Sequence, residues 1–318
     1  MSVLLSALVS TLVSTLLALL MDYRWGEPKR MHPLVGFGSL ADGIENWLNQ
    51  QPQAEVSRWW GLAAWALAVL PLTYVAYSVD QSMGSSWLLH TFASAAVLYL
   101  AIGWQSLLQH AKAIYEPLKA GDMAQARMAL SYIVSRDTQD LNEQEIATAA
   151  TESVLENGAD AIFAALFWFL IAGIPGVVLY RLSNTLDAMW GYKNQRFLHF
   201  GWAAARIDDL LNFMPARLTA LTYTLCGNRT VAWRSWRAQA GTWKSPNAGP
   251  VMASGAGALH VQLGGAAPYH GQLQERPVLG EGVPAQAETI NQACKLVNHG
   301  LLLWVAAIVG LFLLVAWL

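Results

Sequence analysis

The amino-terminal stretch VLLSALVSTLVSTLLALLM, residues 3–21, contains no charged side chain and decides the class of fold. At 1.5 Å per residue, a helix of this length crosses the hydrocarbon core of a bilayer. A cleaved signal peptide is the alternative, but the stretch lacks a basic start and has no small-x-small cleavage site before Asp22. We therefore interpret residues 3–21 as a retained transmembrane helix.

The composition also favours a membrane protein. Of the 318 residues, 55% are hydrophobic and only 13% are charged, whereas soluble domains carry about 25% charged residues. The 15 tryptophans suit helices that cross the membrane–water interface. With a net charge of −2 and no basic block, nucleic acid is not an expected partner. Cys226 and Cys294 form no metal-spaced pair, so neither a disulfide framework nor a zinc site is expected.

Further apolar stretches predict an all-α, polytopic membrane protein that forms a single domain over residues 1–318. Three further spans are predicted, at residues 60–79, 87–108 and 300–318. Residues 161–182 are apolar but contain Gly-Ile-Pro-Gly, where proline removes a backbone donor. We expect a broken or re-entrant helix there, with an ordinary kinked span as the alternative.

Polar stretches complete the predicted topology. Residues 199–226 predict a polar helix that lines a protein cavity, because charged side chains at membrane depth are costly. Residues 227–299 are predicted to be a long cytoplasmic loop. Basic residues concentrate after the first span, in residues 110–160 and in residues 227–299. The positive-inside rule therefore places these stretches in the cytoplasm and both termini outside it.

The most informative polar motif is a row of acidic residues. Glu152, Glu156 and Asp160 are spaced by four, which places them on one face of a helix. A capping box formed by Asn142 and Glu145 is expected to begin that helix. A solvated face normally interleaves Lys or Arg with its acids, and this helix has neither. The pattern favours cation binding, and hard carboxylate oxygens suit Mg²⁺.

The other candidate residues occur in short polar segments between the apolar ones. A purely structural role is the alternative for each segment: its residues could be interfacial anchors or turn residues, and Arg206 and Asp209 could form an intrahelical ion pair. Asp208 has no such partner and is expected to point elsewhere. No Walker-type phosphate loop or dinucleotide fingerprint is present. The candidates are Asp22, His32, Arg136, Asp137, Asn184, Asp187, Lys193, Arg206, Asp208, Asp209, Arg217, Ser245 and Asn247.

In their order and spacing these motifs resemble the CbiB/CobD family of cobalamin-biosynthesis membrane proteins. The resemblance covers nearly the whole chain and departs at Ala165, where family members often have proline, and at Arg181, where many have lysine. The motifs are GEP at 26–28, HP at 32–33, RDT at 136–138, ESVxENxxD at 152–160, NTLDxMxGYK at 184–193, ARxDD at 205–209, NxxPARL at 212–218 and SPN at 245–247.

The resemblance implies adenosylcobinamide-phosphate synthase chemistry. Such an enzyme joins aminopropanol or its phosphate to the propionate of adenosylcobyric acid, with ATP as co-substrate and Mg²⁺ as cofactor. The implied partners are the corrinoid and amino-alcohol substrates, the lipid bilayer and other cobalamin-assembly enzymes. The implied location is the bacterial inner membrane, with the active site facing the cytoplasm. Because ATP is cytoplasmic, a re-entrant break within residues 161–182 is favoured over a full crossing.

Residue roles follow from the resemblance and from phosphate chemistry, where arginine forks suit oxyanions. Two alternatives to the synthase function are a non-catalytic membrane sensor and a corrinoid transporter. A transporter would place its charges within the spans. Catalysis is assigned to Glu152, Glu156, Asp187, Lys193 and Asp208, and metal binding to Glu152, Glu156, Asp160 and Asp209. Substrate or phosphate binding is assigned to Asp22, His32, Arg136, Asp137, Asn184, Arg206, Arg217, Ser245 and Asn247.

Overall fold

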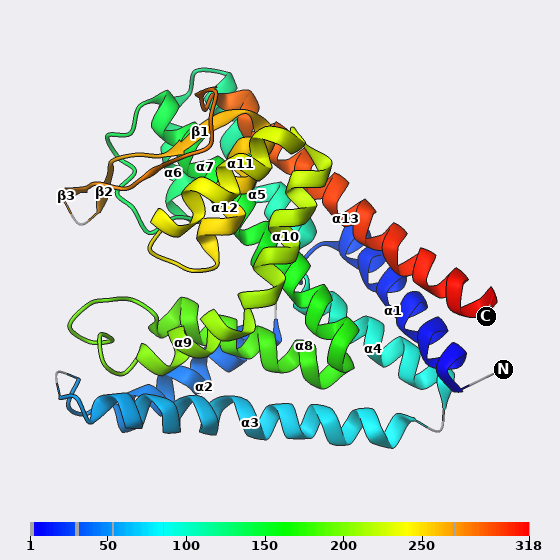
Figure 1. Ribbon diagram of the computed structural model, residues 1–318. Coiled ribbons are helices and arrows are strands. Elements are labelled where there is room, and N and C mark those ends of the chain that lie inside the picture. The colour runs from blue at the N-terminus through cyan, green and yellow to red at the C-terminus, as the bar shows by residue number, and fades with distance from the viewer. Residues whose placement is uncertain (1–2, 29–31, 53, 85, 270, 318) are drawn as a thin grey trace. The chain divides into compact units, whose positions relative to one another are not determined.

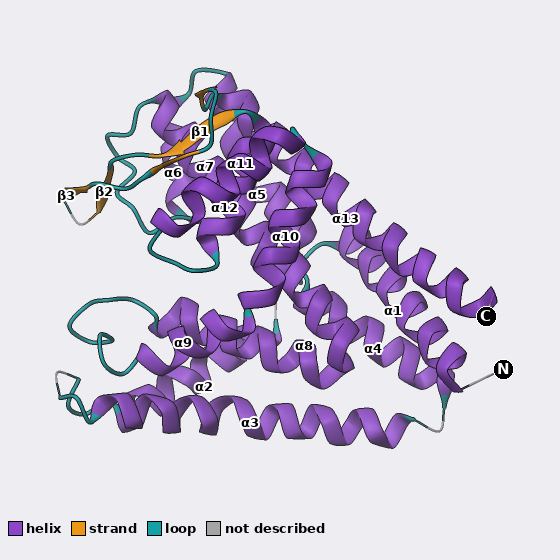
Figure 2. Ribbon diagram, viewed as in Figure 1, coloured by secondary structure: helices purple, strands orange, loops and turns teal. Residues whose placement is uncertain are grey.

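The computed structural model describes residues 3–28, 32–52, 54–84, 86–269 and 271–317, and most of these are helical (Figures 1 and 2). Its contacts divide the chain into two compact units, which are described separately. Unit 1 comprises Met1–Gly103, Ala164–Asn212 and Ile308–Leu318, and unit 2 comprises Trp104–Phe163 and Phe213–Ala307. The expected single domain therefore contains two interleaved groups of contacts.

The described part of unit 1 is helical, with helices of 10 to 27 residues. The second of them begins at Pro33, and the ring of His32 caps it by accepting a hydrogen bond from the Leu34 amide. Proline is favoured there because the first helical amide needs no partner. The helices are α1 (Val3–Trp25), α2 (Pro33–Leu48), α3 (Ser57–Met83), α4 (Trp87–Ala101), α8 (Ala164–Trp190) and α9 (Trp202–Leu211).

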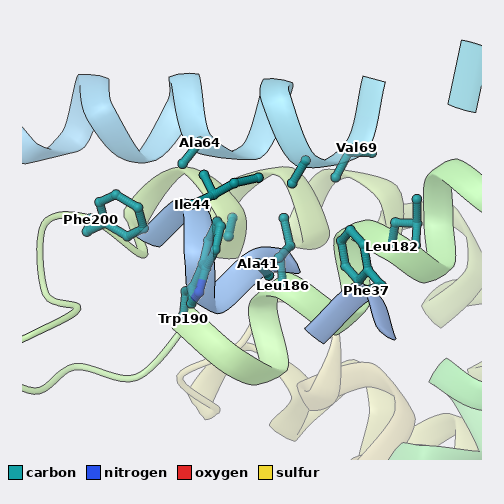
Figure 3. Packing of buried hydrophobic residues seen from close by; sticks show 11 residues of the cluster. Phe37, Ala41, Ile44, Ala64, Val69, Leu182, Leu186, Trp190 and Phe200 are labelled. Carbon is teal, nitrogen blue, oxygen red and sulfur yellow. The ribbon is translucent and has the colours of Figure 1, made fainter. Parts of the chain in front are cut away.

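The core of unit 1 lies between α2, α3 and α8 (Figure 3). Trp190 and Phe200 pack edge to face in it, with ring centroids 5.1 Å apart. Two glycines allow the backbone to approach this pair. A Cβ added at Gly61 would lie 1.9 Å from the Phe200 carbonyl oxygen, and one added at Gly201 would lie 1.7 Å from the Trp190 carbonyl oxygen. The ends of the loop that connects α8 to α9 are therefore in contact.

Four of the predicted spans correspond to long helices, with one correction. Among the described residues, five segments are long and apolar enough to cross a membrane: Ser6–Trp25, Ser57–Met83, Trp87–Lys119, Glu143–Trp190 and Ala287–Trp317. Within the third segment, α4 ends at Ala101, because Ile102 is extended and its amide closes the last turn on Leu98. Residues 87–108 are therefore not one uninterrupted helix. Leu318, the last residue of the fourth predicted span, lies outside the described residues.

The backbone departs from helical geometry inside the apolar segment 161–182, as predicted, while a re-entrant path for this segment stays a prediction. Ala172 and Gly173 leave helical geometry inside α8, and Gly173 has φ 59° and ψ −145°. An L side chain rarely adopts a positive φ, whereas glycine does so without steric cost. Pro175 follows immediately and cannot donate a backbone hydrogen bond. The helix then continues to Trp190, well beyond the predicted end.

The polar stretch 199–226 forms two helices rather than the single one expected. Helix α9 ends at Leu211, and α10 (Phe213–Cys226) begins after Asn212. The Asn212 side chain hydrogen-bonds back to Asp208, and Pro215 lacks a donor in the first turn of α10. The interruption is thus encoded by two residues that disfavour a continuous helix.

Apart from α13, the helices of unit 2 have 16 residues or fewer, and its described residues also form five short strands that the sequence did not predict. Strand β1 pairs antiparallel with β4 and parallel with β5, while β2 and β3 form a hairpin. The elements are α5 (Trp104–Lys119), α6 (Met123–Ser131), α7 (Glu143–Gly158), the π-helix η1 (Ala159–Phe163), α10, α11 (Arg229–Gln239), the 3₁₀ helix η2 (Ala240–Thr242), α12 (Ala248–Leu259), β1 (Val261–Gly264), β2 (Ala267–Tyr269), β3 (Gln272–Gln274), β4 (Val278–Leu279), β5 (Val283–Pro284) and α13 (Ala287–Trp317), whose residues from Ile308 count with unit 1.

The segment 227–299 is therefore structured, and its interpretation as a connecting loop was wrong. Its glycines lie in the buried helix α12 and let neighbours approach closely. A Cβ at Gly255 would lie 2.7 Å from Leu155 Cδ1, and one at Gly257 would lie 2.7 Å from Ala232 Cα. Glycine serves here as a packing residue rather than as a source of flexibility.

Replacing Gly61 by alanine should destabilise unit 1 by about 1–3 kcal/mol, because the new methyl group collides with a carbonyl oxygen that cannot move independently of the backbone. Gly43→Ala in helix α2 is the matched control, since a Cβ there meets nothing within 4 Å. Thermal unfolding in detergent would measure both variants. Equal midpoints for Gly61→Ala and the parent protein would contradict the described packing.

Candidate functional site

The centre of the site in unit 2 is the carboxylate of Glu152 on α7. Arg276 donates two hydrogen bonds to it, Nη1 to Oε2 and Nη2 to Oε1, each 3.1 Å long. Arg136 donates a third from Nη2, and the Gly264 amide donates a fourth at 2.8 Å. Glu152 is only 3% exposed. Two guanidiniums and one carboxylate thus form a buried cluster, hereafter the Glu152 cluster, which carries one excess positive charge.

Secondary structure and aromatic rings hold the two arginines of this cluster. Helix α7 begins with the expected capping box between Asn142 and Glu145, which fixes the first turn of the helix that carries Glu152. Arg276 Nε donates to the Gly265 carbonyl at 3.0 Å. The Arg276 guanidinium also lies 5.3 Å from the centre of the Trp243 ring. Such contacts leave each guanidinium plane little freedom to rotate.

Cavities open on both sides of the arginine pair. The larger has a volume of about 380 Å³ and the smaller about 270 Å³, and both are lined by Arg136 and Arg276. The smaller also meets the amino-terminal turn of α7 and Gly264–Pro268. The larger is lined by Ile133, Val134, Ser135, Arg136, Ala149, Glu152, Ser153, Glu156, Asn157, Trp243, Lys244, Met252, Tyr269, Gln274, Arg276 and Pro277.

Glu156 and Lys244 place opposite charges on the wall of the larger cavity. Both side chains are exposed, in contrast to the buried Glu152. The cavity therefore has two arginines and a lysine as cations and one exposed carboxylate as an anion that is not part of the Glu152 cluster. This arrangement suits a small ligand that carries both a negative group and an ammonium group.

The expected row of three carboxylates is divided by the π-helix. Glu152 and Glu156 both line the larger cavity, but Asp160 lies in η1 and is not among the residues that line it. Among the described residues, no three His, Cys, Asp or Glu side chains are grouped as a metal site. Glu152 accepts four hydrogen bonds, so Glu156 is the cavity carboxylate that fits a metal bound chiefly by substrate phosphates. The magnesium role of these residues remains a prediction.

Four further predicted residues of unit 2 lie outside the Glu152 cluster and make hydrogen bonds elsewhere in the unit. Asp137 Oδ2 accepts a hydrogen bond from the Gly271 amide at 2.7 Å. Arg217 Nη1 donates to Asn247 Oδ1 at 2.9 Å. The hydroxyl of Ser245 accepts from the amides of Asn247 and Ala248, where α12 begins. Ser245, Asn247 and Arg217 therefore lie together at one turn.

A second polar group lies in unit 1 around Asp208. Its carboxylate accepts hydrogen bonds from Asn184 Nδ2 at 3.2 Å and from Asn212 Nδ2 at 3.0 Å. Tyr180 donates to Asn212, and Arg181 donates to Asn184. The net effect of its surroundings raises the pKa of Asp208 to about 6: burial is the main cause, the Asp209 carboxylate adds a smaller increase, and the hydrogen bonds from Asn184 and Asn212 oppose it. The expectation that Asp208 points away from Arg206 is confirmed.

The remaining predicted residues of unit 1 have varied surroundings. Arg206 and Asp209 form the expected ion pair at 3.4 Å on the surface of α9. Asp22 is fully buried in α1, and Asp187 is half-buried in α8. Lys193 is exposed in the loop that connects α8 to α9. The catalytic residues expected from the sequence are thus divided between the units, with Glu152 and Glu156 in one and Asp187, Lys193 and Asp208 in the other.

The larger cavity is also lined by four residues that were not predicted from the sequence: Arg276, Lys244, Trp243 and Tyr269. Arg276 is separated from Glu152 by 124 residues, so no local pattern connects them. One signal was available, because the helix from residue 143 to 158 is acidic and has no basic residue of its own. Arg276 is also the lone Lys or Arg between Lys244 and Lys295. A buried carboxylate needs a cation from elsewhere in the chain.

Long apolar helices mark the chain as a candidate integral membrane protein, and a buried charge cluster lies beside a polar cavity in its unit 2. The family model described as CobD/Cbib protein matches residues 15–297. The chain therefore belongs to the CobD/CbiB family.

Three curated relatives carry the name cobalamin biosynthesis protein CobD. The protein from Stutzerimonas stutzeri is 58% identical over 290 residues, which covers 90% of this chain and 93% of the relative. The Chromobacterium violaceum protein is 56% identical, covering 91% and 93%. The Mycobacterium tuberculosis protein is 38% identical, covering 87% and 88%. No solved structure matches the chain.

Glu152→Gln should lower the free energy of unfolding by about 3–5 kcal/mol, because it leaves two guanidiniums buried without their counter-charge. Glu156→Gln should change stability by less than about 0.5 kcal/mol, since its side chain is exposed. Chemical denaturation in detergent would compare the two. Equal losses for both variants would contradict a structural role specific to Glu152.

Asp208 should make the protein less stable as the pH rises from about 4 to 6. In that interval the unfolded chain has lost the proton, since its pKa is near 3.8, while the folded protein with a pKa of about 6 keeps it. The free energy of unfolding therefore falls by up to about 3 kcal/mol over this interval and then levels off. Asp208→Asn should remove this component, as thermal unfolding from pH 4 to 7 would show. A parent and variant with parallel pH profiles would contradict the assignment.

Proposed function

We propose that the chain joins the amine of an amino alcohol to a propionate of a corrinoid, with ATP providing the driving force. Membership of the CobD/CbiB family supports a place in cobalamin biosynthesis. The observation that carries the finer proposal is the cavity of about 380 Å³ beside Arg136 and Arg276, where fixed cations face a carboxylate. A corrinoid is too large for a cavity of about 380 Å³, so the small substrate or a phosphate chain is the occupant.

The charges of this cavity favour an amino alcohol that is already phosphorylated. A phosphate would bind Arg136, Arg276 and Lys244, and guanidinium forks match its oxygens well. The ammonium group of the same molecule would bind Glu156. A free amino alcohol would leave the excess positive charge of the Glu152 cluster without a counter-charge.

The chemistry requires an activated carboxylate, because an amine does not displace oxide from a carboxylate. The propionate oxygen attacks the γ-phosphorus of ATP, the β–γ bridge bond breaks, and ADP leaves with its electrons. The resulting acyl phosphate is attacked at carbon by the neutral amine. Before this attack one proton of the ammonium passes to Glu156. The amide bond then forms, the carbon–oxygen bond to phosphate breaks, and inorganic phosphate leaves with the second proton of the nitrogen. Placing the amine correctly provides most of the acceleration.

The predicted Mg²⁺ would reduce the charge of the ATP phosphates, and Glu156 is the cavity carboxylate that could contribute a ligand to it. The residues of unit 1 that the family motif includes, Asp187, Lys193 and Asp208, are proposed to act on the corrinoid propionate or on ATP. We propose a multi-pass location in the inner membrane with the cavity facing the cytoplasm, where ATP is present.

Glu156→Gln should reduce the rate of amide formation by about 10²-fold or more, because the variant cannot accept the proton of the amine. The reaction is assembled with ATP, Mg²⁺, adenosylcobyric acid and either aminopropanol or its phosphate, and mass spectrometry detects the product. Glu143→Gln is the matched control, since Glu143 is an exposed acid in the first turn of the same helix. Parent-level turnover by Glu156→Gln would refute the assignment.

Comparing the two amines tests the phosphate proposal separately. Lys244→Gln should raise KM for the phosphorylated amine and leave KM for the free amine unchanged. Equal effects on both amines would show that Lys244 does not bind the phosphate. Transport of unaltered corrinoid into vesicles, without ATP-dependent product, would instead favour a transporter.

A further inference from the structure

We infer that one continuous face of α10 and α11 in unit 2 contacts membrane lipid, with acyl chains along α10 and acidic headgroups along α11. This face is defined by Met214, Leu218, Leu221, Leu225, Arg229, Trp233 and Arg237. The spacing of three or four residues places the α10 members in one row along that helix. The row is independent of the cavity and of the proposed reaction.

The row on α10 is apolar and outward-facing. Met214 is 53% exposed, Leu221 is 40% exposed and Leu225 is 44% exposed. The opposite side of the same helix is buried and includes Thr219 and Tyr223. A helix that exposes a row of large apolar side chains to water is unfavourable, since each buried CH₂ group is worth about 0.8 kcal/mol in transfer studies. The exposed row therefore requires an apolar partner.

Contacts with α13 indicate that this partner is the bilayer. Trp304 Nε1 donates to Thr222 Oγ1 at 2.8 Å, and a Cβ added at Gly300 would lie 2.7 Å from Thr222 Cγ2. Thr222 thus lies against α13 where its uncharged part begins, and α13 belongs to a segment long and apolar enough to cross a membrane. The two helices therefore meet at Thr222. What surrounds such a helix at that depth is lipid.

The length of α10 excludes a full crossing. Its 14 residues extend about 21 Å, which is shorter than the hydrocarbon thickness of about 30 Å. A helix that enters only part of one leaflet must end near the headgroups. Helix α11 begins at Arg229, three residues after α10 ends at Cys226. The change from leucine to arginine and tryptophan occurs at that end, which is the pattern of an interfacial anchor.

The charges on α11 suit an acidic headgroup. Arg229 and Arg237 are exposed, and neither has an ion pair in the part of the chain that the structure describes. Arg234 differs, because Glu281 neutralises it. Trp233 lies between the two arginines, is 47% exposed, and has the Arg237 guanidinium 5.9 Å from its ring centre. Arginine and tryptophan together favour the boundary between acyl chains and phosphate.

Spin labels would test the acyl-chain contact in the full chain, reconstituted in vesicles of phosphatidylethanolamine and phosphatidylglycerol. Labels are placed by Leu221→Cys or Leu225→Cys after Cys226 and Cys294 have been replaced by alanine. We expect oxygen to relax the spin labels at positions 221 and 225, and a water-soluble nickel complex to be unable to reach them. Gln139→Cys, at an exposed loop position, is the aqueous control. Access of nickel to position 221 or 225 equal to that at the control would overturn the inference, and so would protection from both reagents, which would indicate a second protein copy.

Titration with fluorescent phosphatidylglycerol in detergent would test the headgroup contact. Arg229→Gln and Arg237→Gln should each raise the lipid concentration at half-saturation about fivefold, because each removes one cation near the acidic surface. Arg234→Gln should have no effect, since Glu281 already neutralises that arginine. Equal affinity in all three variants, or an effect confined to Arg234→Gln, would refute the proposed site. Far-ultraviolet circular dichroism would verify that each variant is folded.

Discussion

A single buried carboxylate, that of Glu152, connects four separate parts of unit 2. It accepts hydrogen bonds from Arg136, which precedes α7, from the Gly264 amide at the end of β1, and from Arg276 before β4. Desolvating one carboxylate and two guanidiniums is costly, and four hydrogen bonds and mutual attraction offset that cost. The position of both arginines, and therefore the shape of both adjacent cavities, depends on this one side chain.

This constraint gives Glu152 and Glu156 different chemistry although they are one turn apart on the same helix. Glu152 is fully engaged and acts as a fixed support. Glu156 is exposed in the cavity wall, where it can interact with a ligand. Two carboxylates that look equivalent in the sequence therefore differ, because Arg276 from a distant loop donates its hydrogen bonds to Glu152. The local environment, rather than residue type, decides which of them can take part in a reaction.

Several features of the fold followed from the sequence because their causes are local. The uncharged stretches, the capping box of Asn142 with Glu145 and the break at Gly173 are each set by residues within a few positions of one another. The strands and helix α12 were not predicted from the sequence. For α12 the reason is that an alanine- and glycine-rich helix buried on all sides has no polar–apolar period. The role of Arg276 depends on a contact between residues 124 positions apart, which no local pattern records.

The loop that connects α8 to α9 leaves and returns at nearly the same point, because the carbonyl of Trp190 lies against Gly201. Asn194 stabilises the turn within it by accepting hydrogen bonds from the amides of Arg196 and Phe197. Glu45 on α2 holds Arg196 at its base. A loop whose two ends meet in this way can change in length without displacing the helices beside it. The same property makes Gln195, exposed beyond Lys193, a natural graft point for a rigid fiducial domain in electron cryomicroscopy, with Lys193 itself left unchanged.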